Sequence, residues 1–67
     1  MRDEKRIDKF TQQVREFWHM YPDWRFGQFM CNFLGFVTTE TKQDPFFIED
    51  DEMASLLKKY YDQLGGK

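Results

Sequence analysis

The sequence predicts an all-α fold: a compact three-helix domain with a loop or small β-hairpin between the second and third helices. Three segments carry apolar residues at spacings of three and four, the period of an amphipathic helix. Turn-forming residues separate these segments, with Tyr21-Pro22-Asp23 after the first and Asp44-Pro45 before the third. At 67 residues, we expect residues 1–67 to form a single small helical domain around one core.

The first helix is expected over residues 4–20. Asp3 and Glu4 place negative charge near its positive end. The helix should end before Tyr21, because a residue preceding proline is pushed out of the helical region. Its apolar side, at helical spacing, consists of Ile7, Phe10, Val14, Phe17 and Trp18.

The second helix is expected to start at Pro22 or Asp23 and to stop at Gly35. We expect both flanking apolar segments to pack on it. We interpret Gly27 as a point of close approach by another backbone, the first or third helix, in preference to a contact with a small ligand. The stripe assigned to the core is Phe26, Phe29, Met30, Phe33 and Leu34, of which Phe29 and Phe33 should be nearly fully buried.

Residues 36–48 lose the helical period. Val37, Thr38 and Thr39 are β-branched, and residues 36–41 could pair with residues 46–48 as a small hairpin. The alternative is an irregular loop that places Phe46 or Phe47 in the core. We favour the loop and leave a short strand pair open.

The third helix is expected from the acidic run Glu49-Asp50-Asp51-Glu52 to a stop at Gly65-Gly66. Glu49 or Asp50 would be the N-cap, and Ile48 and Met53 are spaced as a hydrophobic staple if Glu49 is the cap. Its buried stripe is Met53, Leu56, Leu57, Tyr60 and Leu64.

Composition limits the function classes. Ten Lys and Arg against twelve Asp and Glu give a net charge of −2, which is unfavourable for nucleic-acid binding without excluding it. Eight Phe, two Trp and three Tyr are many rings for a short chain to cover, and an exposed remainder would be a contact surface for a partner or a second copy. Cys31 is the only cysteine, so no intramolecular disulfide forms, and we place its thiol at the edge of the core.

Targeting signals are also informative. The amino terminus is charged and amphipathic, without the apolar run of a signal peptide. No segment approaches the ~20 apolar residues of a membrane span. We therefore expect a cytoplasmic protein without a membrane partner.

The acidic run has three interpretations. Clustered carboxylates bind hard cations, but four consecutive acids point around the helix axis and lack the spaced ligands of a calcium loop. Helix capping is favoured. The run could instead meet a basic partner surface.

A second candidate lies at the start of the second helix. Arg25, Gln28 and Asn32 form a polar stripe, and a short helix, a tight turn and such a stripe are typical of a DNA-reading helix-turn-helix. The alternative, which we favour, is a structural role in ion pairs and loop contacts. His19 is the only histidine and has no placed nucleophile, so we expect no catalytic residue, cofactor or metal.

Three stretches together resemble a family of very short, uncharacterised proteins of bacteria and their phages. They are Met1-Arg2-Asp3 with Arg6-Ile7, Tyr21 to Phe29 with Asn32, and Asp44 to Glu52. The likeness covers nearly the whole chain. The family has no assigned activity, so the resemblance implies a small helical cytoplasmic protein, plausibly of phage or prophage origin, and no catalytic residue.

We therefore expect a non-enzymatic, protein-binding accessory or modulator, whose partner is another protein or a second copy. The alternative is a helix-turn-helix-like nucleic-acid-binding protein. The first function requires exposed aromatic surface from Trp24, Phe36, Phe46 or Tyr61, and the second requires Arg2, Lys5, Arg6, Lys9 and Arg25 on one face. The candidate partner-binding residues are Glu49, Asp50, Asp51, Glu52, Trp24 and Arg25.

Overall fold

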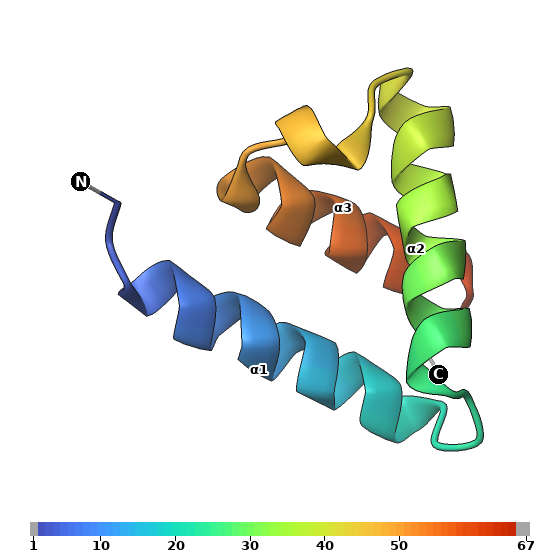
Figure 1. The fold of residues 1–67 in the computed structure, drawn as a ribbon. Helices are drawn as coiled ribbons and strands as arrows, with labels where there is room; N and C mark the ends of the chain where they lie inside the picture. The colour runs from blue at the N-terminus through green and yellow to red at the C-terminus, as the bar shows by residue number, and fades with distance from the viewer. Residues whose placement is uncertain (1, 66–67) are drawn as a thin grey trace.

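The computed structural model describes residues 2–65 and contains three α-helices and one short 3-10 helix (Figure 1). The helices are α1 (Lys5–Met20), α2 (Phe26–Thr41), η1 (Pro45–Phe47) and α3 (Asp50–Gln63). Within residues 2–65 there is no strand, so the all-α, three-helix prediction is confirmed and the hairpin is not formed. Residue 66 of the predicted Gly65-Gly66 stop lies outside the described residues.

Helices α1 and α3 lie side by side and run in the same direction, while α2 crosses them steeply (Figure 1). Near the two helix starts Arg6 pairs with Asp50, and near the two ends Phe17 packs against Tyr61. Helix α3 packs on both α1 and α2. As expected, both flanking helices also pack on α2, because Phe17 of α1 contacts Phe29 of α2 at 4.8 Å between ring centroids and α3 packs on α2.

The bounds of α2 differ from the prediction at both ends. Pro22 and Asp23 lie in the turn that follows α1, and the N-cap is Arg25, whose backbone N–H donates to Gln28 Oε1 at 2.9 Å. The helix continues through Gly35, because a glycine in a helix costs only about 1 kcal/mol and packing by the residues beyond it opposes that cost. Val37 is fully buried and Phe36 is half-buried.

The β-branched residues after Gly35 are helical, contrary to the prediction of a loop. The hydroxyls of Thr38, Thr39 and Thr41 donate to the carbonyls four residues earlier, at 3.2, 3.0 and 2.8 Å. The helix ends at Lys42, a non-glycine residue in the left-handed region (φ 59°), whose N–H donates to Thr38 O at 2.8 Å. The C-cap residue is not a glycine, so the sequence offers no sign of a helix end at Lys42. The prediction therefore ended the helix at Gly35.

The core is a row along α2 set against α3. Phe29, Phe33 and Val37, four residues apart, are 0%, 2% and 0% exposed. The burial predicted for Phe29 and Phe33 is confirmed. The other buried residues are Phe17 on α1, Ile48 before α3, and Leu56 and Leu57 on α3.

Several residues predicted to be core are exposed instead. Phe26 and Leu34 lie on the flank of the buried row of α2, Ile7 lies near the start of α1, and Leu64 follows α3. The i, i+4, i+8 row of α2 faces α3, so Phe26 on its flank contacts the Trp18 ring of α1 at 5.8 Å between centroids but stays 58% exposed. Gly27 is also not a close-approach point, because a Cβ there would meet nothing within 4 Å.

Phe17 joins the three helices through its ring. It contacts Phe29 at 4.8 Å, Tyr61 at 5.0 Å and Tyr60 at 5.7 Å between ring centroids. The turn after α1 is closed by Trp18 Nε1, which donates to Trp24 O at 2.7 Å. The short α1–α2 connection is therefore fixed by its own aromatic residues.

The segment between α2 and α3 is held at both ends. Asp44 Oδ1 accepts from the Phe46 N–H at 2.9 Å, and Pro45 begins η1. Ile48 is buried, Met53 is half-buried, and both belong to the core cluster as the staple predicts. Phe46 and Phe47 themselves are exposed, so the expectation that one of them enters the core is wrong.

Phe33→Ala should unfold the domain. Removing a fully buried ring costs about 3–5 kcal/mol, which is comparable to the whole stability of a domain this small. The matched control is Leu34→Ala, one residue further along the same helix and 38% exposed. Thermal melts followed by circular dichroism should show a cooperative transition for the control, and the same melt for Phe33→Ala would contradict this core.

Candidate functional site

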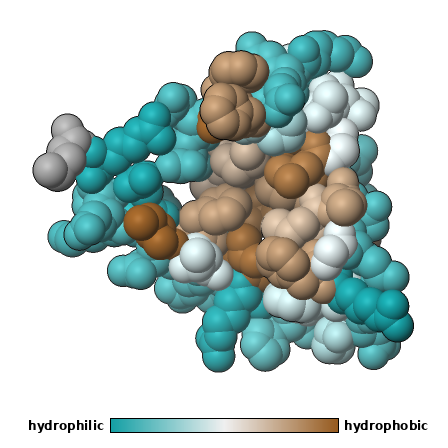
Figure 2. All heavy atoms as spheres, viewed as in Figure 1, coloured by the Kyte–Doolittle hydropathy of each residue, from teal (hydrophilic) through white to brown (hydrophobic). Residues whose placement is uncertain are grey.

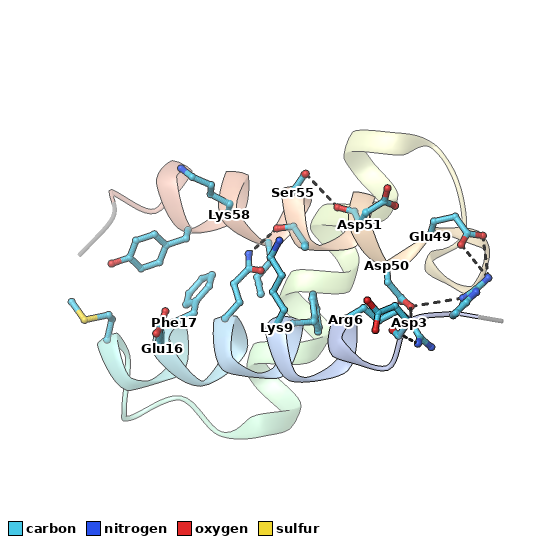
Figure 3. Close-up of a pocket in the computed structure, with 17 residues that line it drawn as sticks. Asp3, Arg6, Lys9, Glu16, Phe17, Glu49, Asp50, Asp51, Ser55 and Lys58 are labelled. Carbon is cyan, nitrogen blue, oxygen red and sulfur yellow. Dashed lines mark hydrogen bonds and ion pairs between the residues drawn. The ribbon is translucent and has the colours of Figure 1, made fainter.

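A groove runs between α1 and α3 on the side away from α2 (Figure 3). Its cavity volume is ≈ 1130 Å³. Gln13 Nε2 spans it to Ala54 O at 2.7 Å, and the Phe17 and Tyr61 rings meet edge to face beyond that bridge. Apart from the ion-paired Arg6 and Asp50, the buried and half-buried lining residues are Phe10, Gln13, Phe17, Ala54, Leu57 and Tyr61. Below the charged rim, the groove is therefore largely apolar.

The acidic run lies at one end of this groove, where α1 and α3 begin (Figure 3). Arg6 Nε donates to Asp50 Oδ2 at 2.6 Å, and Arg2 Nη2 lies 3.0 Å from Glu49 Oε1. Arg2 Nη1 also lies 3.7 Å from Asp50 Oδ2. Two arginines from the start of the chain therefore offset two acids at the start of α3.

These ion pairs modify the capping interpretation. Glu49 is the N-cap of α3 by position, as one of the two predicted alternatives, but its side chain accepts no helix N–H. Asp50, Asp51 and Glu52 occupy the first turn, where the helix dipole favours negative charge. Asp50 also ties α3 to α1 through Arg6, and Glu49 pairs with Arg2 just before the two helices. Sequence reasoning missed these pairs because Arg2 and Arg6 lie more than forty residues earlier.

The carboxylates do not assemble a cation site. Within residues 2–65, no three His, Cys, Asp or Glu side chains converge in a way that could hold a metal ion. Asp51 and Glu52 are exposed, and Asp51 Oδ1 accepts from the Glu52 backbone N–H at 2.8 Å. Asp51 and Glu52 are thus the members of the run that form no ion pair within residues 2–65.

Trp24 and Arg25 lie at the opposite end of the molecule from the acidic run. Trp24 is half-buried and stacks on Tyr21, with centroids 4.4 Å apart. Arg25 is exposed and forms no ion pair within residues 2–65. The sixteen residues of α1 separate the two groups by about 24 Å at 1.5 Å per residue. The six predicted partner-binding residues therefore do not form one site.

The turn beside Trp24 holds Tyr21, which neighbours Tyr60 of α3. The Tyr21 hydroxyl is buried and has no hydrogen-bond partner within the part of the chain described. Burial raises the pKa of the Tyr60 phenol above its ordinary value of 10.0, and the neighbouring Tyr21 raises it further. Burying an unpaired hydroxyl costs stability, on the order of 1–3 kcal/mol.

A surface that sequence reasoning named only in part, through Phe46, lies on α2 and η1. We define the α2–η1 face as Phe26, Met30 and Leu34 on α2 with Phe46 and Phe47 on η1. Phe46 and Phe47 are 84% and 71% exposed, and their rings meet edge to face at 5.0 Å. Figure 2 shows hydrophobic side chains gathered across the middle of the visible face, between α1, α2 and η1, and at η1 itself.

Cys31 and His19, two residues considered in the sequence analysis, are both exposed. Cys31 is exposed on α2, so its expected place at the edge of the core is wrong. His19 is exposed near the end of α1.

No helix within residues 2–65 has the length and apolar run needed to cross a bilayer.

Comparison of the chain with protein-family models, curated proteins and solved structures finds no match in any of the three. Two surfaces are available: the α1–α3 groove, whose charged end is internally paired, and the α2–η1 face, which is apolar and, apart from the half-buried Met30, exposed.

The ion pair between Arg6 and Asp50 should couple α1 to α3 by at most about 1 kcal/mol, because both side chains are more than a third exposed. A double-mutant cycle of Arg6→Gln and Asp50→Asn, measured by urea denaturation, should show this coupling at low salt and its decline as salt is added. Asp51→Asn, in the same turn but outside any ion pair within residues 2–65, is the control. Zero coupling at low salt would show that the pair does not hold the helices together.

Proposed function

We propose that this chain is a small, non-enzymatic protein-binding module that contacts its partner through the α2–η1 face. The observation that carries the proposal is the exposure of Phe46 and Phe47, two adjacent rings of a chain with limited core volume. Large exposed apolar patches on small soluble domains mark interaction sites more often than scattered single residues do. The protein-binding hypothesis names four aromatic residues as alternatives for this surface. Phe46 is exposed, whereas Trp24, Phe36 and Tyr61 are half-buried.

The charge distribution of α2 supports this proposal. Glu40 is its only charged residue, and Lys59 of α3 pairs with it. A helix that faced only water would ordinarily carry charges on its outer side. The centres of protein interfaces are depleted in charged residues and enriched in aromatic residues and Met, and α2 with η1 has that composition.

The nucleic-acid alternative receives less support. Arg25, Gln28 and Asn32 are exposed, as that reading requires. Arg2 and Arg6, however, are engaged with Glu49 and Asp50 at the far end of α1. The cations needed to neutralise phosphates are thus divided between two ends of the molecule.

Site-specific photocrosslinking tests the proposal. We expect p-benzoylphenylalanine in place of Phe46 or Phe26 to give light-dependent adducts with protein in the producing cells, because both rings are exposed on the proposed contact face. The control position is Gln12, which is exposed on the polar side of α1.

Adducts at positions 46 and 26 and none at position 12 would support the proposal. No adduct at any position, or equal adducts at all three, would contradict it. Denaturing electrophoresis followed by mass spectrometry of the adducts provides the measurement.

A further inference from the structure

We infer that the partner of the α2–η1 face is a second copy of this chain, in a symmetric dimer with α2 packed antiparallel against its counterpart. This inference rests on the proposed function, because it assigns the occupant of the same face. It depends on the exposed area of the molecule, the neutrality of the face and the positions of its rings at the two ends of α2.

The exposed area of the isolated chain is large for its mass. The accessible surface is 5314 Å². A folded monomer of 8.3 kDa typically exposes about 4,600 Å². The excess of about 700 Å² is close to the ~800 Å² that each partner buries in a standard interface. The rings of Phe46 and Phe47, which are 84% and 71% exposed, are part of this exposed area.

The neutrality of the face suits two identical chains. Each copy carries a net charge of −2, so two copies repel unless they meet where neither presents charge. The α2–η1 face provides such a surface, because its five defining side chains are uncharged and Glu40 is paired with Lys59. A partner chosen by charge would instead be met by the exposed Asp51 and Glu52, which lie on α3.

A two-fold axis perpendicular to α2 makes the two helices antiparallel, which also opposes their dipoles. Phe26 lies at the start of α2, and η1 packs on α2 after the helix ends. The antiparallel arrangement therefore brings Phe26 of one copy toward Phe46 and Phe47 of the other, twice per dimer. Each copy supplies both halves of the contact, and no exposed ring of the face lacks a counterpart.

Analytical ultracentrifugation tests the dimer directly. We expect the wild-type chain to show a concentration-dependent rise from the mass of one chain to that of two, with a Kd below about 1 mM. Phe26→Lys and Phe47→Glu should each weaken association at least tenfold, because each places an unpaired charge in the apolar contact. Gln12→Lys is the control, and circular dichroism checks that all variants fold.

Mixing the two variants tests the antiparallel geometry. An equimolar mixture of Phe26→Lys and Phe47→Glu should regain association, because a mixed dimer places the new lysine beside the new glutamate. Association of the wild type without recovery in the mixture would overturn the antiparallel arrangement.

A wild-type chain that remains monomeric up to about 1 mM would overturn the dimer. A different result would contradict the proposed function, namely the absence of crosslinks specific to positions 46 and 26. Crosslinks from these positions to a different protein, with a monomeric wild type, would leave the proposed function standing and remove the second copy as the partner.

Discussion

The contact of Phe29, Phe33 and Val37 on α2 with Leu57 on α3 is the interaction on which the rest of the structure depends. All four side chains are 2% exposed or less. Burying a large apolar side chain contributes about 1.5–3 kcal/mol, and few other side chains in this chain are buried so completely. Because this row fixes one side of α2 against α3, the side with Phe26 and Leu34 is left outside. The core and the proposed contact face are therefore two sides of the same helix.

The position of α1 follows from a second set of contacts. Phe17 packs among rings from α2 and α3 near the end of α1, and Arg6 pairs with Asp50 near its start. These two contacts hold α1 parallel to α3 along its length and leave the α1–α3 groove between them. The groove is rimmed by charges that are in part paired with each other, whereas the α2–η1 face is apolar. This difference favours α2 and η1 as the surface that meets another protein.

Much of the fold could be predicted from the sequence, because hydrophobic periodicity reports which residues share a helix face. The fold class and the burial of Phe29 and Phe33 follow from that periodicity. The end of α2 could not be predicted, because Gly35 resembles a stop and the β-branched Thr38 and Thr39 resemble a strand. Packing of Val37 and hydroxyl-to-carbonyl bonds within the helix outweigh both local preferences. The site was less predictable still, since the partners of Glu49 and Asp50 are distant in sequence and the exposure of Phe47 depends on where η1 lies.

Amide hydrogen exchange followed by NMR tests the central claim most directly, namely that one buried row holds the three helices together. The amides of Phe29, Phe33, Val37 and Leu57 should exchange only through global unfolding, with one common free energy, while those of η1 should exchange faster through local opening. Protection should extend along α2 beyond Gly35 to Thr41. If residues 36–41 exchange at the rate of an unstructured loop, or if the four core amides open independently, the buried row does not hold the fold together.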